Sequence, residues 1–180
     1  RLDGTGVDSA SQLSDSLYSG SKPKAEEAFQ FLSKLGIKTI LSVDGSVPEF
    51  ELAAKSGLTY AHVPIGYDEI APEEQVGIIK AVKESPGPVY VHCHHGKHRG
   101  PAAAMIAREA LEGISCEDAV KALELSETGK EYEGLYRDVR EAIVSRVLLE
   151  KTGEAEPELA GYLAARPVET VRALLGLVQR

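Results

Sequence analysis

The chain has 180 residues and a mass of 19.3 kDa, which is enough to bury one sizeable core and favours a single domain over several. Its 20 Lys and Arg against 28 Asp and Glu give a net charge of −8, so we expect no nucleic-acid partner, and a phosphate-rich ligand would need a local exception. With 43% hydrophobic residues and no apolar run near the roughly 18 residues that span a bilayer, the composition predicts a soluble globular protein without a membrane span.

The N-terminal end, residues 1–15, is rich in Ser, Asp and Gly without periodicity, which predicts an irregular arm. The chain opens at Arg1 without methionine, which is compatible with a cytoplasmic protein and with a processed or exported form. We expect residues 16–180 to form one domain, and no pattern in them specifies an oligomeric state.

From Leu17 onward, short β-branched runs alternate with helical stretches that Gly and Pro punctuate. Strands are predicted at 17–19, 37–43, 58–65 and 89–91. Helices are predicted at 23–34, 46–57, 72–85, 100–113 and from 115 onward. This alternation is typical of an α/β fold with a central, mostly parallel sheet of four to five strands flanked by helices.

The C-terminal third, about residues 115–180, is predicted to be entirely helical. Apolar residues recur at helical spacing between Tyr132 and Val147, and a last helix is expected between Pro167 and Val178. Stripes of this kind are core positions far more often than cofactor sites, so no cofactor is expected.

A cysteine and an arginine bracket the turn between the last predicted strand and the helix that follows. Cys93 ends the strand, Gly96 lies in the turn, and Arg99 stands six positions after the cysteine. Successive backbone N–H groups and the positive end of a helix form an anion site. The planar guanidinium of Arg99 would hold two phosphoryl oxygens, and the same field favours a reactive thiolate at Cys93.

The stretch from His92-Cys93 through Arg99 resembles the active-site loop of the protein tyrosine phosphatase superfamily. Its segment Gly96-Lys97-His98-Arg99 is most similar to the plant and fungal atypical dual-specificity phosphatases, and the similarity in pattern spans about residues 16–112. The resemblance implies that Cys93 attacks phosphorus to form a cysteinyl-phosphate, that Arg99 binds the equatorial oxygens and that His92 keeps the thiolate charged and oriented. The implied phosphate-binding residues are His94, His95, Gly96, Lys97, His98, Arg99 and Gly100.

The superfamily carries its general acid on a loop upstream of the cysteine, here residues 66–71. Asp68 is the first candidate for this acid and Glu69 the second. The alternative interpretation is that both are solvated loop carboxylates, because the segment Gly66-Tyr67-Asp68-Glu69 does not reproduce the family's Trp-Pro-Asp pattern.

Gly100 stands where most members of the superfamily carry Ser or Thr, whose hydroxyl steadies the leaving thiolate when the phosphocysteine breaks down. Its absence leads to the hypothesis of slow hydrolysis of the intermediate. A catalytically weak phosphate-binding pseudophosphatase is therefore one alternative. A rhodanese-like or arsenate-reductase-like cysteine enzyme is another, because those enzymes also place a reactive cysteine on a loop before a helix.

Four of the five histidines, at 92, 94, 95 and 98, lie in the cysteine loop. No metal site is predicted, because consecutive residues point in divergent directions and the usual spaced ligand pairs are absent. The segment 85–108 contains no Asp or Glu, so its basic loop suits a phosphorylated substrate, either a phosphoprotein or, with several phosphates, an inositol polyphosphate. Cys116 is interpreted as a packing residue rather than a partner for Cys93.

Overall fold

The computed structural model describes residues 6–142 and shows an α/β architecture. The strands are β1 (Ser11–Gln12), β2 (Leu17–Ser21), β3 (Thr39–Ser42), β4 (Thr59–His62) and β5 (Val89–Cys93). The helices are α1 (Glu26–Lys34), α2 (Phe50–Lys55), α3 (Pro72–Lys83), α4 (Arg99–Glu112), α5 (Cys116–Leu125) and α6 (Glu133–Arg140). Within this part of the chain the predicted fold class is confirmed.

The five strands form one sheet in the order β1-β2-β5-β3-β4, in which only β1 runs antiparallel to its neighbour. Strand β5 lies in the middle and is buried at every position, as expected for an apolar run covered on both faces. It pairs Cys93 with Ser21 of β2 and His92 with Ser42 of β3. The loops that leave β2, β3 and β5 therefore meet at the carboxyl edge of the sheet, where ligands bind in open α/β sheets.

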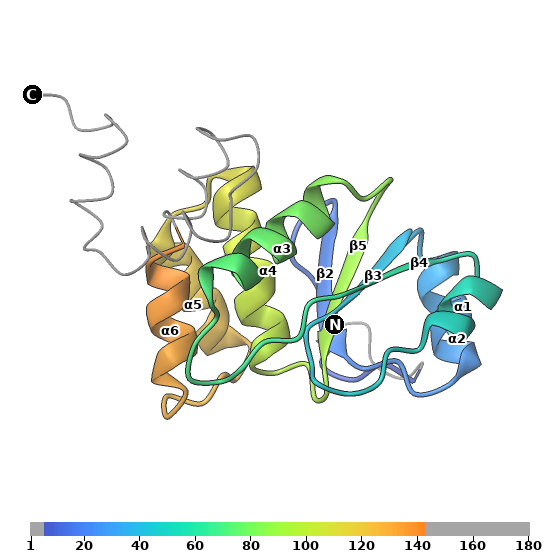
Figure 1. Cartoon of the computed structure of the whole chain (residues 1–180), viewed down its shortest axis with the longest axis horizontal. Coiled ribbons are helices and arrows are strands. Elements are labelled where there is room, and N and C mark those ends of the chain that lie inside the picture. Colours follow the sequence, from blue (N-terminus) through green and yellow to red (C-terminus); the bar gives the residue numbers. More distant parts are fainter. Residues whose placement is uncertain (1–5, 143–180) are drawn as a thin grey trace, which may run out of the picture.

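Helices α1 and α2 cover one face of the sheet, and α3 to α6 cover the other (Figure 1). Because side chains alternate along a strand, Val91 and Cys93 of β5 face the layer of α3 to α6, whereas Tyr90 belongs to the core beneath α1. The layer formed by α3 to α6 therefore lies directly against the strand that ends in Cys93.

Residues 6–15 are attached to the sheet more closely than their composition indicates. Strand β1 pairs with β2, and both Val7 and Ala10 are fully buried in the core beneath α1. A two-residue edge strand leaves no readable alternation, which is why the sequence predicted only an irregular arm here. The helix predicted between Pro167 and Val178 lies outside the described residues.

The chain beyond β4 continues along the sheet without forming a regular strand. Strand β4 ends at His62, three residues before the predicted end, yet the N–H of Ile65 donates to the carbonyl of Val43 at 3.1 Å. This bond fixes the point at which the loop 66–71 leaves the sheet. Within residues 6–142, no helix combines the length and the apolar content needed to cross a membrane.

Candidate active site

Cys93 is the last residue of β5, and its side chain is only 2% exposed. Residues 94–98 form an irregular turn, and α4 begins at Arg99. No side chain caps α4, and its first turn contains no acidic residue. The first N–H groups of a helix have no partner inside the helix, so this N-terminus presents donors and a positive dipole beside the cysteine.

Gly96 allows the turn to lie against strand β2. Its φ is +74°, and a Cβ at this position would overlap the backbone of Gly20 and Ser21. The turn is tied to β2 a second time by the N–H of Lys22, which donates to the carbonyl of His94 at 3.3 Å. A left-handed residue in direct contact with backbone must be glycine, so the path of the turn depends on Gly96.

Arg99 is held on two sides. Its Nη1 donates to the carbonyl of Ile65 at 3.3 Å, and its Cζ lies 4.5 Å from the centroid of the Tyr67 ring. The Nε of Arg99 is buried and has no hydrogen-bond partner among the described residues. The guanidinium is therefore oriented by the neighbouring loop and retains a donor for a ligand.

His92 is fully buried on the face of β5 opposite Cys93. Its Nε2 lies 3.0 Å from the hydroxyl of Tyr60, and burial lowers the pKa of His92 to about 4, against the opposing influence of the Asp44 carboxylate. At neutral pH the imidazole is uncharged. Its contact with Tyr60 holds the ring on the far face of β5, and the role that the resemblance gives His92 toward the thiolate stays a prediction.

Asp44 is a buried carboxylate at the carboxyl edge that the sequence analysis missed. It follows β3, is 1% exposed, and its Oδ1 accepts hydrogen bonds from the N–H (2.7 Å) and hydroxyl (2.5 Å) of Ser46. Burial alone would raise the pKa of Asp44, but these bonds, together with His92 and Arg99, bring it below its usual value. The sequence feature that could have identified Asp44 is its position directly after a predicted buried parallel strand.

The side chains on the outer rim of the turn differ in exposure and in their contacts with other side chains. His94 and His95 are exposed, with ring centroids 4.5 Å apart. The Nζ of Lys97 pairs with Glu127 at 2.5 Å, and the ring of His98 lies 4.5 Å from that of Tyr132. Burial lowers the pKa of His98, so the rim is less basic at neutral pH than a count of its residues suggests.

A groove of about 750 Å³ runs along this rim and adds basic residues that the sequence did not single out. Lys22 and Lys24 line it from the chain after β2, together with His94, His95, Lys97 and His98. Each of the two added lysines has an acidic partner, Glu49 at 3.1 Å and Asp8 at 2.5 Å respectively. The lysines lie some seventy positions before the cysteine loop, and only the pairing of β2 with β5 brings them there.

The loop 66–71 lies beside the cysteine turn. A general acid carried by this loop would need such a position. Tyr67 joins the two segments, because its ring contacts Arg99 and stacks on Tyr132 with centroids 4.8 Å apart. Asp68 and Glu69 follow directly, and both are exposed. The structure thus places Asp68 next to a residue that touches Arg99.

Gly100 faces the cysteine. A Cβ at Gly100 would lie 3.5 Å from the Sγ of Cys93 and 3.2 Å from the hydroxyl of Ser19. Ser19 is buried, and its hydroxyl has no hydrogen-bond partner in the described part of the chain. The space that a hydroxyl at position 100 would occupy therefore adjoins both the thiol and an unpaired serine.

Cys116, at the start of α5, is exposed, so its interpretation as a packing residue is wrong. The buried positions of α5 begin only at Ala119. Across residues 6–142, no three His, Cys, Asp or Glu side chains are grouped so that they could hold a metal ion.

A parallel sheet whose central strand ends in a buried cysteine, followed by a tight turn and an arginine at a helix N-terminus, is the arrangement expected of the protein tyrosine phosphatase superfamily. The chain belongs to the family described as "Polymorphic toxin system, DSP-PTPase phosphatase", whose model matches residues 15–111. The superfamily resemblance is confirmed, while the plant and fungal branch stays a prediction. No curated protein matches the chain.

Solved structures of phosphatases share the fold. TpbA from P. aeruginosa has a TM-score of 0.63 at 17% identity, covering 92% of this chain and 100% of its own. The core catalytic domain of the PP-IP phosphatase SIW14 from S. cerevisiae has a TM-score of 0.62 at 20% identity, covering 73% and 83% respectively. Tk-PTP has a TM-score of 0.60 at 18% identity, covering 74% and 97%.

Proposed function

We propose that this phosphatase hydrolyses phosphate monoesters through a cysteinyl-phosphate intermediate on Cys93. The observation that supports this most strongly is the position of Cys93 and Arg99 at the two ends of one turn, at the uncapped N-terminus of α4. The turn supplies N–H donors and the arginine supplies a fixed cation, so a phosphoryl group bound there would lie beside the sulfur.

The first step transfers the phosphoryl group to the enzyme. The thiolate of Cys93 attacks phosphorus, an S–P bond forms and the P–O bond to the leaving group breaks. Arg99 and the N–H groups of the turn stabilise the charge on the equatorial oxygens. Asp68, in its protonated form, gives its proton to the leaving oxygen, because an alkoxide or phenoxide otherwise leaves poorly. Glu69 is the alternative acid on the same loop.

The second step returns the enzyme to its starting form. The carboxylate of Asp68 takes a proton from water as the water oxygen attacks phosphorus. The S–P bond breaks, the thiolate of Cys93 is restored, and inorganic phosphate leaves. Gly100 supplies no hydroxyl to steady the departing thiolate, so this second step is expected to be the slower one.

We infer that the substrate carries more than one phosphate, and an inositol polyphosphate fits this description. The groove beside the turn is lined by Lys22 and Lys24, whose ion pairs are partly exposed and contribute only about 0–1 kcal/mol each. A second phosphate would displace such weak partners readily. Among the structures with this fold, SIW14 is titled a PP-IP phosphatase, whereas TpbA was solved with phosphotyrosine. A phosphoprotein is therefore the alternative substrate.

The second candidate function is a phosphate-binding pseudophosphatase. Gly100 favours this alternative, since a chain without the hydroxyl beside Cys93 would bind phosphate and turn over little. The family assignment weighs against the rhodanese-like and arsenate-reductase-like alternatives.

Release of phosphate from an aryl phosphate between pH 5 and 8 tests the enzymatic proposal. The native chain should be active, Cys93→Ser inactive, and Cys116→Ser, at the exposed second cysteine, fully active. No release by the native chain would leave the binding module as the better account. The substrate proposal is tested with Lys24→Gln, which should raise KM for an inositol polyphosphate and leave KM for phenyl phosphate unchanged.

A further inference from the structure

Helix α6 holds the loop 66–71 through two adjacent residues. Asp138 is 5% exposed, and its Oδ2 accepts a hydrogen bond from the N–H of Ile70 at 2.5 Å. Its Oδ1 accepts from the Nε of Arg137 at 2.8 Å, and the Nη2 of Arg137 donates to the carbonyl of Asp68 at 3.0 Å. These three bonds form a closed ring that joins both ends of the segment Asp68–Ile70 to α6.

The loop backbone also lies directly on the helix. A Cβ at Gly134 would overlap the carbonyl group of Asp68, so only glycine allows this approach. Glycine is unfavourable inside a helix, and the close contact with the loop explains why α6 has a glycine at position 134. Tyr132, immediately before α6, stacks on Tyr67 and extends the contact to the start of the loop.

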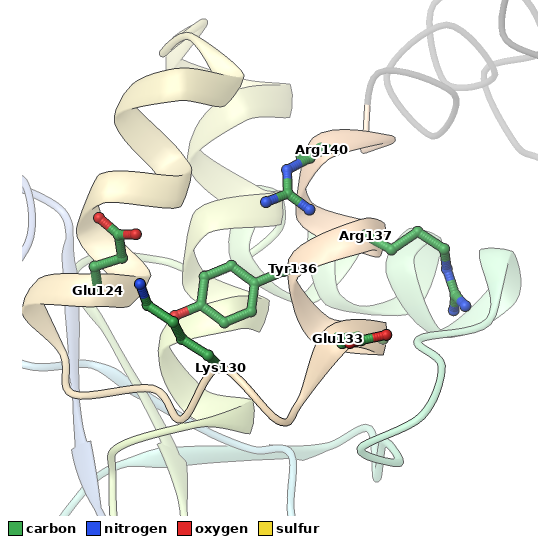
Figure 2. Close-up of a pocket in the computed structure, with 7 residues that line it drawn as sticks. Glu124, Lys130, Glu133, Tyr136, Arg137 and Arg140 are labelled. Carbon is green, nitrogen blue, oxygen red and sulfur yellow. The ribbon is translucent and has the colours of Figure 1, made fainter.

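Arg137 links the loop to its own helix, because it donates both to the carbonyl of Asp68 and to the carboxylate of Asp138. Figure 2 shows its side chain leaving α6 on the side opposite Tyr136 and Lys130. Arg140, one turn further on, instead lies over the ring of Tyr136, with its Cζ 5.8 Å from the ring centroid. The two arginines thus share a helix and differ in whether they contact the loop.

We propose that Arg137 and Asp138 are positioning residues that hold the Asp68 loop against the cysteine turn for proton transfer to the leaving group. This rests on the proposed function, in which Asp68 is the acid. The bonds restrain the backbone on both sides of Glu69 and leave the Asp68 side chain exposed. Helix α6 therefore takes part in the step that protonates the leaving group, besides covering the sheet.

The test compares two esters that differ in how much they need an acid. Phenyl phosphate has a poor leaving group that requires a proton, whereas 2,4-dinitrophenyl phosphate leaves without one. We expect Arg137→Met to lower kcat/KM about tenfold for the phenyl ester, a fraction of the 10²- to 10⁴-fold that an acid contributes, and to leave the dinitrophenyl ester unchanged. The matched control, Arg140→Met, should leave both values unchanged.

Two results would overturn the positioning role. One is an equal loss of kcat/KM, or no loss, for both esters in Arg137→Met. The other is a double variant, Asp68→Asn/Arg137→Met, that is slower on the phenyl ester than Asp68→Asn alone. A residue that acts through Asp68 has no effect once Asp68 is disabled, so we expect the two rates to be equal.

Hydrogen exchange separates this proposal from the proposed function. If the native chain hydrolyses neither ester, the phosphatase mechanism fails, and exchange at the buried N–H of Ile70 still tests the tether. That amide should exchange slowly in the native chain and in Arg140→Met, and at least about tenfold faster in Arg137→Met. Unchanged exchange in Arg137→Met would overturn the tether.

Discussion

The guanidinium of Arg99 lies over the ring of Tyr67, with its Cζ 4.5 Å from the ring centroid. The arginine begins α4 and the tyrosine belongs to the loop 66–71, so this contact joins the phosphate-binding turn to the loop of the proposed acid. The same tyrosine stacks on Tyr132, which brings the approach to α6 into the site as well.

Replacing Tyr67 with Ala should weaken phosphate binding by about 5- to 30-fold. A cation–π contact of this kind contributes about 1–2 kcal/mol, and its loss frees the guanidinium of Arg99 from one of its two supports. Inhibition by inorganic phosphate measures the change. Tyr67→Phe keeps the ring and serves as the control. An equal effect of both variants would contradict a role for the ring itself.

Replacing Gly96 with Ala should abolish activity and destabilise the fold by more than about 2 kcal/mol. The added Cβ would overlap the backbone of β2 in addition to the strain of a positive φ. Gly113 makes a matched control, because its φ is +72° and nothing lies within 4 Å of a Cβ there. Gly113→Ala should cost only about 1–2 kcal/mol and leave activity intact. Urea unfolding and phosphate release compare the two.

Replacing Gly100 with Ser should speed hydrolysis of the intermediate about tenfold, since a hydroxyl beside the sulfur stabilises the departing thiolate. The new Cβ would lie 3.2 Å from both the Cys93 nitrogen and the Ser19 hydroxyl, at a cost of about 1 kcal/mol in stability. Pre-steady-state kinetics should show a burst in the native chain and a smaller burst in Gly100→Ser. Gly100→Ala adds the same crowding without the hydroxyl. A native steady rate equal to the first turnover would refute the slow second step.

Replacing Glu109 with Gln should stabilise the protein by up to about 3 kcal/mol at pH 8 and leave stability at pH 4 unchanged. Glu109 is buried in α4, its Oε1 has no hydrogen-bond partner within residues 6–142, and burial raises its pKa to about 7. A carboxyl whose folded pKa is raised contributes stability that is present below the unfolded pKa of 4.5 and lost as pH rises toward 7. The neutral amide of Gln at position 109 does not ionise, so the variant does not lose this stability as pH rises.

His92 acts in the opposite direction and becomes visible in the Glu109→Gln variant. Its folded pKa of about 4 lies below the unfolded value of 6.5, so its neutral form stabilises the fold above pH 6.5, and this contribution is lost as pH falls toward 4. Urea unfolding of the variant from pH 4 to 8 should therefore show stability rising with pH. In the native chain the two contributions oppose each other, so its profile should be flatter. A variant profile identical to the native one would contradict the Glu109 assignment, and a variant profile that does not rise with pH would contradict the His92 assignment.

The fold was predictable from local signals. Buried apolar runs such as Val89–Val91 and the Gly and Pro residues between them specified a mostly parallel sheet with helices on its faces. Cys93, Gly96 and Arg99 were predictable as a group because they are close in sequence and share one strand-to-helix turn.

The rest of the site depends on contacts between distant segments. Asp44 and Lys22 reach the site only because β3 and β2 flank β5. The helical spacing in α6 indicated a core stripe, but it did not show that Arg137 and Asp138 bind the loop of Asp68. Such roles follow from strand order and helix docking, which no local pattern specifies.

Detection of a phosphoryl group on Cys93 tests the central claim most directly. The native chain is mixed with 2,4-dinitrophenyl phosphate, quenched in acid within the first turnover, and its peptides are analysed by mass spectrometry. We predict one phosphoryl group on the peptide that contains Cys93, none on the peptide that contains Cys116, and none in Cys93→Ser. Release of phosphate by the native chain with Cys93 unmodified throughout the first turnover, or equal release by Cys93→Ser, would contradict the account.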